Sequence, residues 1–463
     1  MPVQTDLLQP DRGQAARTIE IVATAGFDTW LNAQPPRTRA ALAAQKMRGK
    51  PGSSAVVPGD GPGDGEDWSV VLAHGSSTLG AWDLARLAET LPEGSYRLLG
   101  AYAGAAMLGW VLGQYRFDRY RKPDEEGARI LLSDEPAKID ETLRIAAATA
   151  LVRDLVNIGA SDLGPAELEA EAAKLAEAQG ATLSVTRGEA LAKGYPMIQA
   201  VGQAAAKGRE PRLIELEWGD PKSPRIAIIG KGVCFDSGGL DIKPGSGMRL
   251  MKKDMGGAAH ALALAGLIMS ARLKVRLHLL IPAVENAVSG NAFRPGDVLA
   301  TRKGLTVENS NTDAEGRLIL GDALTRAGED QPELILDFAT LTGAARVALG
   351  PDLPATFAND ESLAEALLTA ARTVDDPLWR LPLWDGYDEM LKSDVADMVN
   401  APDGGYAGAV TAALFLRRFV PEGTPWAHLD TFSWRPSPKP GRPKGGDALG
   451  LRASWAMLKA RYG

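Results

Sequence analysis

The stretch that decides the fold of this 463-residue chain runs from Ile226 to Gly239 and reads Ile-Ala-Ile-Ile-Gly-Lys-Gly-Val-Cys-Phe-Asp-Ser-Gly-Gly. Its first four residues are all apolar, which is typical of a short strand buried on both faces. Two charged residues, Lys231 and Asp236, follow among glycines. Because ligands in open α/β sheets bind where strands end, this run predicts an α/β fold with a site just after the strand.

A nucleotide-binding loop is the alternative interpretation of these glycines. Gly230-Lys231-Gly232 is followed by Val-Cys-Phe, which fits neither Gly-x-Gly-x-x-Gly nor the Walker pattern. The sequence therefore argues against a dinucleotide or P-loop site, and we interpret Cys234 as a small buried side chain.

The composition restricts the kind of ligand and the location. The formal net charge of −7 argues against nucleic-acid binding, which usually needs a basic surface. No apolar stretch reaches the roughly 20 residues of a membrane span. Residues 1–11 lack a secretory signal pattern, so a cytoplasmic location is expected. The single cysteine and four scattered histidines cannot form the common zinc motifs, so they are interpreted as structural. Any metal must be held by carboxylates.

Four carboxylates fall where strands end or helices begin. Asp236 follows the strand, Asp254 opens an apolar helix, and Asp313 and Glu315 precede another helix. Asp254 alone also fits a helix N-cap, and Thr312 with Glu315 fits a capping box. In an extended segment, however, Asp313 and Glu315 project to the same side. Crowded carboxylates repel one another unless cations neutralise them, so two neighbouring divalent ions are predicted.

The pattern along the chain predicts two α/β domains, residues 1–150 and residues 151–463. The smaller first domain alternates strands and helices, and Pro51–Asp67 is predicted to be an exposed loop. The larger second domain is predicted to be catalytic, with a central mixed β-sheet flanked by helices. Its expected strands are Leu213–Glu217, Ile226–Ile229, Val275–Ile281, Leu334–Phe338 and Ala427–Leu429, and its expected helices include Pro165–Gln179, Gly257–Ala271, Arg317–Ala327 and Glu361–Arg372.

The segment Asn311–Leu318, Asn-Thr-Asp-Ala-Glu-Gly-Arg-Leu, strongly resembles the signature of the cytosol aminopeptidase (leucyl aminopeptidase) family of dinuclear metallopeptidases. The likeness covers roughly Arg153 to the C-terminus. Further matching motifs are Gly230–Gly232, Phe235–Gly239, Asp254–Ala258, Pro295–Val298, Ala339–Ala344, Asp394–Asp397 and Trp426–Asp430.

This resemblance implies a role for each matching residue. The tighter metal would be held by Lys231, Asp236, Asp254 and Glu315, and the more exchangeable metal by Asp236, Asp313 and Glu315. Lys243 would polarise the scissile carbonyl, and Arg317, beside Gly316 at a helix start, would hold a bicarbonate ion as general base. The residues implied to bind substrate are Met251, Thr340, Leu341 and Ala344.

The activity that the resemblance implies is removal of one N-terminal residue, leucine-like by preference, from peptides with a free N-terminus. The ions would be zinc or manganese, with magnesium as the alternative, and the assembly a homo-hexamer. Two other hypotheses are a regulatory protein on an aminopeptidase scaffold and a phosphoesterase. The acidic charge and complete ligand set argue against the first, and the lack of suitable histidines and phosphate loops argues against the second.

Overall fold

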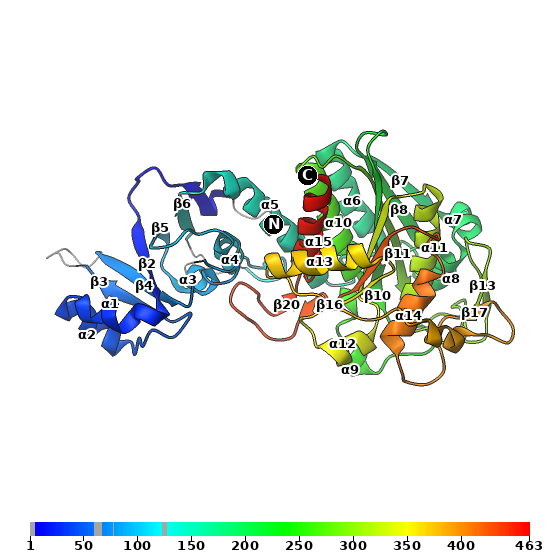
Figure 1. Ribbon diagram of the computed structural model, residues 1–463. Coiled ribbons are helices and arrows are strands. Elements are labelled where there is room, and N and C mark those ends of the chain that lie inside the picture. The colour runs from blue at the N-terminus through cyan, green and yellow to red at the C-terminus, as the bar shows by residue number, and fades with distance from the viewer. Residues whose placement is uncertain (1–4, 60–66, 77, 123–126) are drawn as a thin grey trace. The chain divides into compact units, whose positions relative to one another are not determined.

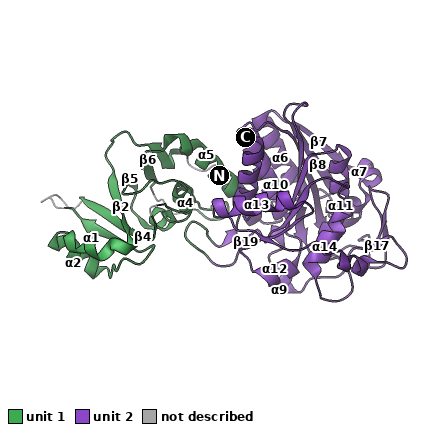
Figure 2. Cartoon of the chain, viewed as in Figure 1, with its two compact units in different colours: residues 1–150, 438–443 green, residues 151–437, 444–463 purple. Residues whose placement is uncertain are grey.

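The computed structural model describes residues 5–59, 67–76, 78–122 and 127–463. The chain forms two compact units (Figure 2). Unit 1 consists of residues 1–150 and 438–443, and unit 2 of residues 151–437 and 444–463. The sequence of unit 2 is thus interrupted by a short segment that belongs to unit 1.

Unit 1 is built on a six-stranded sheet with helices on both faces. Successive residues of β4 alternate between two apolar clusters, so both faces of the sheet are covered. All neighbouring strands are parallel except β3, which runs antiparallel to β4. The strand order is β1 (Leu8–Pro10), β6 (Arg129–Ser133), β5 (Gly94–Leu99), β2 (Arg17–Ala23), β4 (Trp68–His74) and β3 (Ser54–Pro58), and the helices are α1 (Phe27–Ala33), α2 (Pro36–Ala44), α3 (Ala85–Thr90) and α4 (Ala106–Gly113).

The predicted loop Pro51–Asp67 is wrong over Ser54–Pro58, which forms the edge strand β3. Ala55 and Val57 are buried while Ser54 and Val56 are exposed, the alternation expected of an edge strand. This five-residue alternation is too short to stand out among glycines and prolines. Residues 60–66 of the predicted loop lie outside the described residues.

Unit 2 contains a nine-stranded mixed sheet (Figure 1). Its centre is parallel, because β9 pairs in parallel with both β14 and β11. β10 continues along the edge of β11 beyond the end of β9, so the loop expected after Gly230 is in fact a second short strand ending at Asp236. The order is β16 (Trp379–Arg380), β15 (Ala355–Ala358), β18 (Trp426–Asp430), β14 (Leu334–Ala339), β9 (Arg225–Gly230), β11 (Arg276–Asn286), β8 (Arg212–Trp218) and β7 (Thr182–Arg187), with β10 (Gly232–Asp236) on β11.

Helices cover both faces of this sheet. α10 (Gly256–Ser270) packs on β9 and β14 together with α6 (Pro165–Gln179) and α15 (Leu451–Tyr462), whereas α11 (Glu315–Glu329) packs with α8 (Pro196–Gly202) and α14 (Gly408–Arg417). A Cβ on Gly257 would lie 2.1 Å from the carbonyl oxygen of Phe338, so only glycine lets α10 begin directly against the end of β14. The remaining elements are α5 (Pro136–Asn157), α7 (Gly188–Gly194), α9 (Gly245–Met248), α12 (Gly343–Leu349), α13 (Glu361–Thr373), β12 (Val298–Ala300), β13 (Thr306–Glu308), β17 (Met398–Val399), β19 (Trp434–Arg435) and β20 (Gly445–Gly446).

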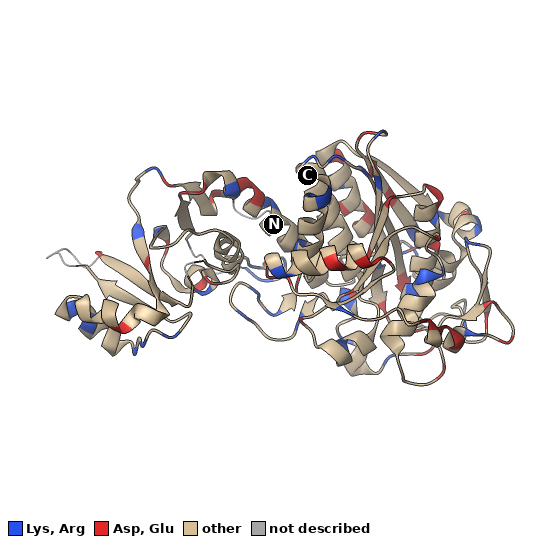
Figure 3. Cartoon of the chain, in the orientation of Figure 1, with Lys and Arg blue, Asp and Glu red and all other residues tan. Residues whose placement is uncertain are grey.

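The predicted fold class is confirmed: a smaller N-terminal α/β unit precedes a larger unit whose mixed sheet is flanked by helices. Among the described residues, no helix combines the length and the apolar character that a membrane span requires. Acidic and basic positions are interspersed in both units in the view of Figure 3.

Candidate metal centre

A cavity of about 470 Å³ lies beyond the ends of β10, β14 and β18 in unit 2. Asp236 reaches it from the end of β10, Asp254 from the short 3₁₀ turn Met251–Met255 before α10, and Glu315 from the first residue of α11. Lys243 lines this cavity. So do all five predicted ligands, namely Lys231, Asp236, Asp254, Asp313 and Glu315. Ligand-type oxygens of Asp236, Asp313 and Glu315 lie within 4.8 Å of one another.

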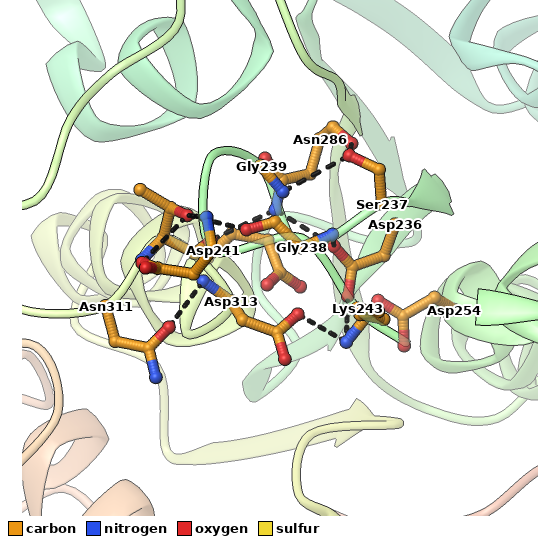
Figure 4. A network of polar contacts seen from close by, with 12 residues as sticks. Asp236, Ser237, Gly238, Gly239, Asp241, Lys243, Asp254, Asn286, Asn311 and Asp313 are labelled. Carbon is orange, nitrogen blue, oxygen red and sulfur yellow. Dashed lines mark hydrogen bonds and ion pairs between the residues drawn. The ribbon is translucent and has the colours of Figure 1, made fainter. Parts of the chain in front are cut away.

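Two lysines, Lys231 and Lys243, each pair with two of these carboxylates, and a third, Lys253, lies 3.4 Å from Asp254 Oδ1. Lys231 Nζ lies 2.7 Å from Asp254 Oδ2 and 2.8 Å from Glu315 Oε1. Lys243 Nζ lies 2.8 Å from Asp236 Oδ2 and also pairs with Asp313 (Figure 4). Burial lowers the pKa of Lys231 and Lys243, but the neighbouring carboxylates outweigh burial and raise each pKa above its ordinary value.

The carboxylates divide by how well they are neutralised. Burial, reinforced by the negative charge of Asp236, raises the pKa of Glu315 to about 8 and that of Asp313 to about 6. Burial opposes ionisation of Asp254 as well, but Lys231 and Lys253 together hold the pKa of that carboxyl well below its usual range. The protein's own cations thus satisfy Asp254 and leave the Asp313–Glu315 side short of positive charge.

The donor set fits divalent cations. Glu315 Oε2 is buried and accepts no hydrogen bond from any residue that the structure describes. A buried carboxylate oxygen without a donor is costly, and a cation bound between it, Asp236 and Asp313 would remove that cost. Oxygen donors with one lysine amine suit hard or borderline divalent ions.

Three of the four predicted substrate residues line the cavity, namely Met251, Thr340 and Leu341. Thr340 Oγ1 also donates to Asp254 Oδ1 at 2.7 Å. Ala344 is exposed on α12 and does not line the cavity as the structure describes it, although Gly343 and Ala345 do.

The predicted anion-binding pair lies behind the cavity lining. Arg317 is buried, its Nη1 donates to Asn400 O at 2.7 Å, and its Nε has no acceptor among the described residues. Burial lowers the pKa of Arg317 to about 10. A Cβ on Gly316 would lie 2.7 Å from Lys231 Nζ, so glycine at this position leaves room for the lysine side chain to reach the carboxylates.

Both helix-capping interpretations are wrong. Met255, not Asp254, is the N-cap of α10, and Ala314 is the N-cap of α11 without a side-chain bond. Thr312 Oγ1 donates instead to Gly238 O at 2.6 Å, which ties the loop before α11 to the loop after β10. Thr312 therefore joins the two ligand-bearing loops, and Asp254 accepts a hydrogen bond from Thr340, so neither side chain caps a helix.

Sequence reasoning missed several residues at this site. Lys253 is buried and lines the cavity, and Arg346 stacks on Phe432, another lining residue. Asn286, the last residue of β11, contacts both ligand-bearing loops. A polar residue that ends a long apolar strand was the available signal for Asn286. All four histidines lie within the described ranges and none lines the cavity, and Cys234 is buried.

Comparison with known sequences gives the family. Residues 150–454 match the profile described as the cytosol aminopeptidase family, catalytic domain, and residues 18–133 match the M17 aminopeptidase N-terminal domain. The chain belongs to the cytosol aminopeptidase family. This confirms the resemblance drawn from the motifs, and it makes the chain a metal-dependent aminopeptidase of that family.

Curated members of the cytosol aminopeptidase family are similar over most of the chain. A probable cytosol aminopeptidase of Syntrophotalea carbinolica is 43% identical over 369 residues, which are 76% of this chain and 73% of that protein. One from Roseiflexus castenholzii is 42% identical over 392 residues, covering 81% of this chain and 80% of that protein.

Solved structures similar to this chain show the same architecture. A cytosol aminopeptidase from Coxiella burnetii superposes with a TM-score of 0.93 at 44% identity, covering 99% of this chain and all of that one. The bottromycin maturation enzyme BotP, solved in complex with Mn, gives a TM-score of 0.85 at 33% identity over 96% of this chain and 100% of that one.

Proposed function

We propose that the chain is a dinuclear aminopeptidase that removes a single N-terminal residue, leucine-like by preference, from peptides. The observation that carries this proposal is the convergence of Asp236, Asp313 and Glu315 in one cavity, where a buried Glu315 oxygen has no donor among the residues that the structure describes. Residues 151–463 would form the catalytic domain.

The division of ligands between two ions is the one that the family resemblance implies, and the lining of one cavity by all five residues supports it. Lys231, Asp236, Asp254 and Glu315 would hold the tighter ion, and Asp236, Asp313 and Glu315 the exchangeable one. The ions supply Lewis acidity and a nucleophile at neutral pH. They would be zinc or manganese, with magnesium as the alternative, and the Mn complex of BotP supports manganese.

Two cationic side chains, Lys243 and Arg317, would take part in the reaction. Lys243 reaches the cavity from the loop after β10, where its ammonium can stabilise negative charge developing on the scissile carbonyl oxygen. Arg317 lies at the start of α11, where its Nε has no acceptor among the described residues, and with Gly316 it would hold a bicarbonate ion that would serve as general base. The side chain of the N-terminal residue would meet Met251, Thr340 and Leu341 in the cavity, and the resemblance adds Ala344, which lies between the lining residues Gly343 and Ala345.

We further propose a homo-hexamer, as the family resemblance implies, and a cytoplasmic location, following the name cytosol aminopeptidase that its relatives carry. A size measurement in solution that finds monomers alone would contradict the assembly.

The test of the activity compares leucyl-leucine with its N-acetylated form, using protein loaded with Zn²⁺ or Mn²⁺. We expect release of leucine from the free peptide only, because an acetylated nitrogen cannot coordinate a metal. Cleavage of both peptides, or of neither, would contradict the proposal. A series of N-terminal leucine, alanine and aspartate substrates tests the preference.

A further inference from the structure

Asn286 ends β11 between the two loops that carry most of the predicted ligands. Its Nδ2 donates to Asp236 Oδ1 at 2.9 Å and to the carbonyl oxygen of Thr312 at 3.0 Å. The side chain is 1% exposed. Figure 4 shows this amide beside Asp236 and the loop that continues to Asp313. One side chain thus joins the end of β10 to the loop before α11.

The orientation of the amide is fixed by its own hydrogen bonds. Both N–H groups of Asn286 meet acceptors, so the reversed amide would place its oxygen against two other oxygens. Asp236 Oδ1 also accepts from the Gly238 backbone N–H at 2.8 Å. These two donors hold one oxygen of Asp236 away from the cavity and leave Oδ2 facing Lys243.

The backbone and the surrounding space keep Asn286 in place. Its carbonyl oxygen accepts from Ser237 N at 3.0 Å and from Ser237 Oγ at 2.8 Å. A Cβ on Gly239 would lie 2.9 Å from both Asn286 Oδ1 and Thr312 Oγ1, and Gly239 has a φ of +66°. Glycine therefore leaves room for the amide to lie between the two loops.

We infer that Asn286 is a positioning residue that sets the affinity of the exchangeable ion more than that of the tighter ion. Asn286 orients Asp236, which is proposed for both ions, and it fixes Thr312, the residue before Asp313, which is proposed for the exchangeable ion alone. It makes no hydrogen bond to Lys231 or Asp254 in the part of the chain that the structure describes. This inference rests on the proposed two-metal function.

The experiment is a calorimetric titration of the metal-free full-length chain with Mn²⁺ alone. In Asn286→Ala we expect the weaker binding event to lose about 10- to 100-fold in affinity, as loss of outer-shell support does elsewhere, and the tighter event to change less. Asn286→Asp keeps the size of the side chain but turns an acceptor toward Asp236 Oδ1, so its loss should be at least as large. It also serves if the alanine variant does not fold.

The matched control is Asn291→Ala, which removes an exposed amide that donates to Gln203 O and touches no predicted ligand. The unfolding free energy of each metal-free variant separates support of the fold from support of the ions. A purely structural role would lower that free energy and leave the Mn²⁺ dissociation constants unchanged.

Two results overturn the inference. Weaker-site affinities of both Asn286 variants within about threefold of wild type would remove it, since threefold is less than 1 kcal/mol. Equal losses at both sites would remove the distinction between the ions. A wild-type chain that binds no Mn²⁺ would overturn the proposed function and this inference with it, whereas tight binding by wild type and variants alike overturns the inference alone.

Discussion

Unit 2 contains two clusters of metal-ligand side chains that look alike in composition and differ in how they are neutralised. In one, Arg225 Nη2 lies 2.6 Å from Glu217 and 2.8 Å from Asp330, and Arg326 Nη1 lies 2.8 Å from Asp330. In the other, two lysines share four carboxylates. The arginine-paired cluster consists of Glu217, His278 and Asp330. The lysine-paired cluster consists of Asp236, Asp313 and Glu315.

The difference shows how acidic residues become a binding site. Guanidinium groups are always charged and offer several donors in a fixed fork, so arginines satisfy a carboxylate permanently. An ammonium is a point charge, and in the described part of the chain Lys231 and Lys243 leave one oxygen of Glu315 without a donor. The arginine-paired cluster is therefore an ion-pair network, and the lysine-paired cluster keeps a need for further cations.

The largest effect should separate the two clusters by activity. Asp254→Asn removes a proposed ligand of the tighter ion, so kcat/KM for leucyl-leucine should fall at least about 1000-fold, because the loss amounts to several kcal/mol of transition-state stabilisation. Glu217→Gln should stay within about threefold of wild type, since partly exposed ion pairs contribute little. Comparable losses in the two variants would erase the distinction.

Lys243→Ala should separate charge stabilisation from metal binding within the lysine-paired cluster. We expect it to keep both ions and to lose about 100- to 1000-fold in kcat, the effect of removing one donor from an oxyanion site. Metal analysis of the purified variant accompanies the kinetics. An empty metal site in this variant would show that the lysine supports the carboxylates rather than the reaction.

Removing the metal should destabilise the fold through one cluster alone. Ions that bind only the folded chain add about 2.7 kcal/mol at a concentration 100 times their dissociation constant. Urea unfolding with Mn²⁺ and with a chelator measures this difference. Glu315→Gln should abolish most of the stabilisation by Mn²⁺, whereas Glu217→Gln should keep it in full. Loss of the stabilisation in Glu217→Gln would show that ions bind the arginine-paired cluster instead.

The smallest effect should come from the arginine-paired cluster. Arg225→Met removes one of the two arginine partners of both Glu217 and Asp330, which are partly exposed, so the free energy of unfolding should fall by about 1 kcal/mol or less. Metal content and kcat should match wild type. Arg276→Met, which removes a longer 3.5 Å contact to Glu217, is the matched control and should cost less. A change in bound metal would contradict the assignment.

The sequence predicted those elements whose pattern is strong and long. α6 has the predicted bounds, Pro165–Gln179, because a proline at its start and a glycine after its end mark them. β7 was not predicted, because its Thr-Leu-Ser-Val-Thr-Arg sequence is mostly polar at the sheet edge. The sequence predicts a loop where β10 lies, because the glycines and charged residues around this five-residue strand are typical of loops.

The ligands of the site could be predicted because they stand in short local motifs. The residues that orient them could not, because their partners are distant in the chain: Asn286 is 50 positions from Asp236 and 26 from Thr312. Both capping interpretations failed for the same reason. Each interpretation fitted the local sequence, but the side chains of Asp254 and Thr312 form hydrogen bonds with residues distant in the chain instead.

The short segment 438–443 of unit 1 has a consequence for the order of folding during synthesis. Gly441 N donates to Glu89 Oε1 at 2.6 Å, and the Arg442 guanidinium lies 4.4 Å from the centre of the Trp82 ring. A ribosome makes this segment only after residues 151–437 of unit 2. Although N-terminal domains generally fold first, unit 1 can complete its contacts only after most of unit 2 has been synthesised.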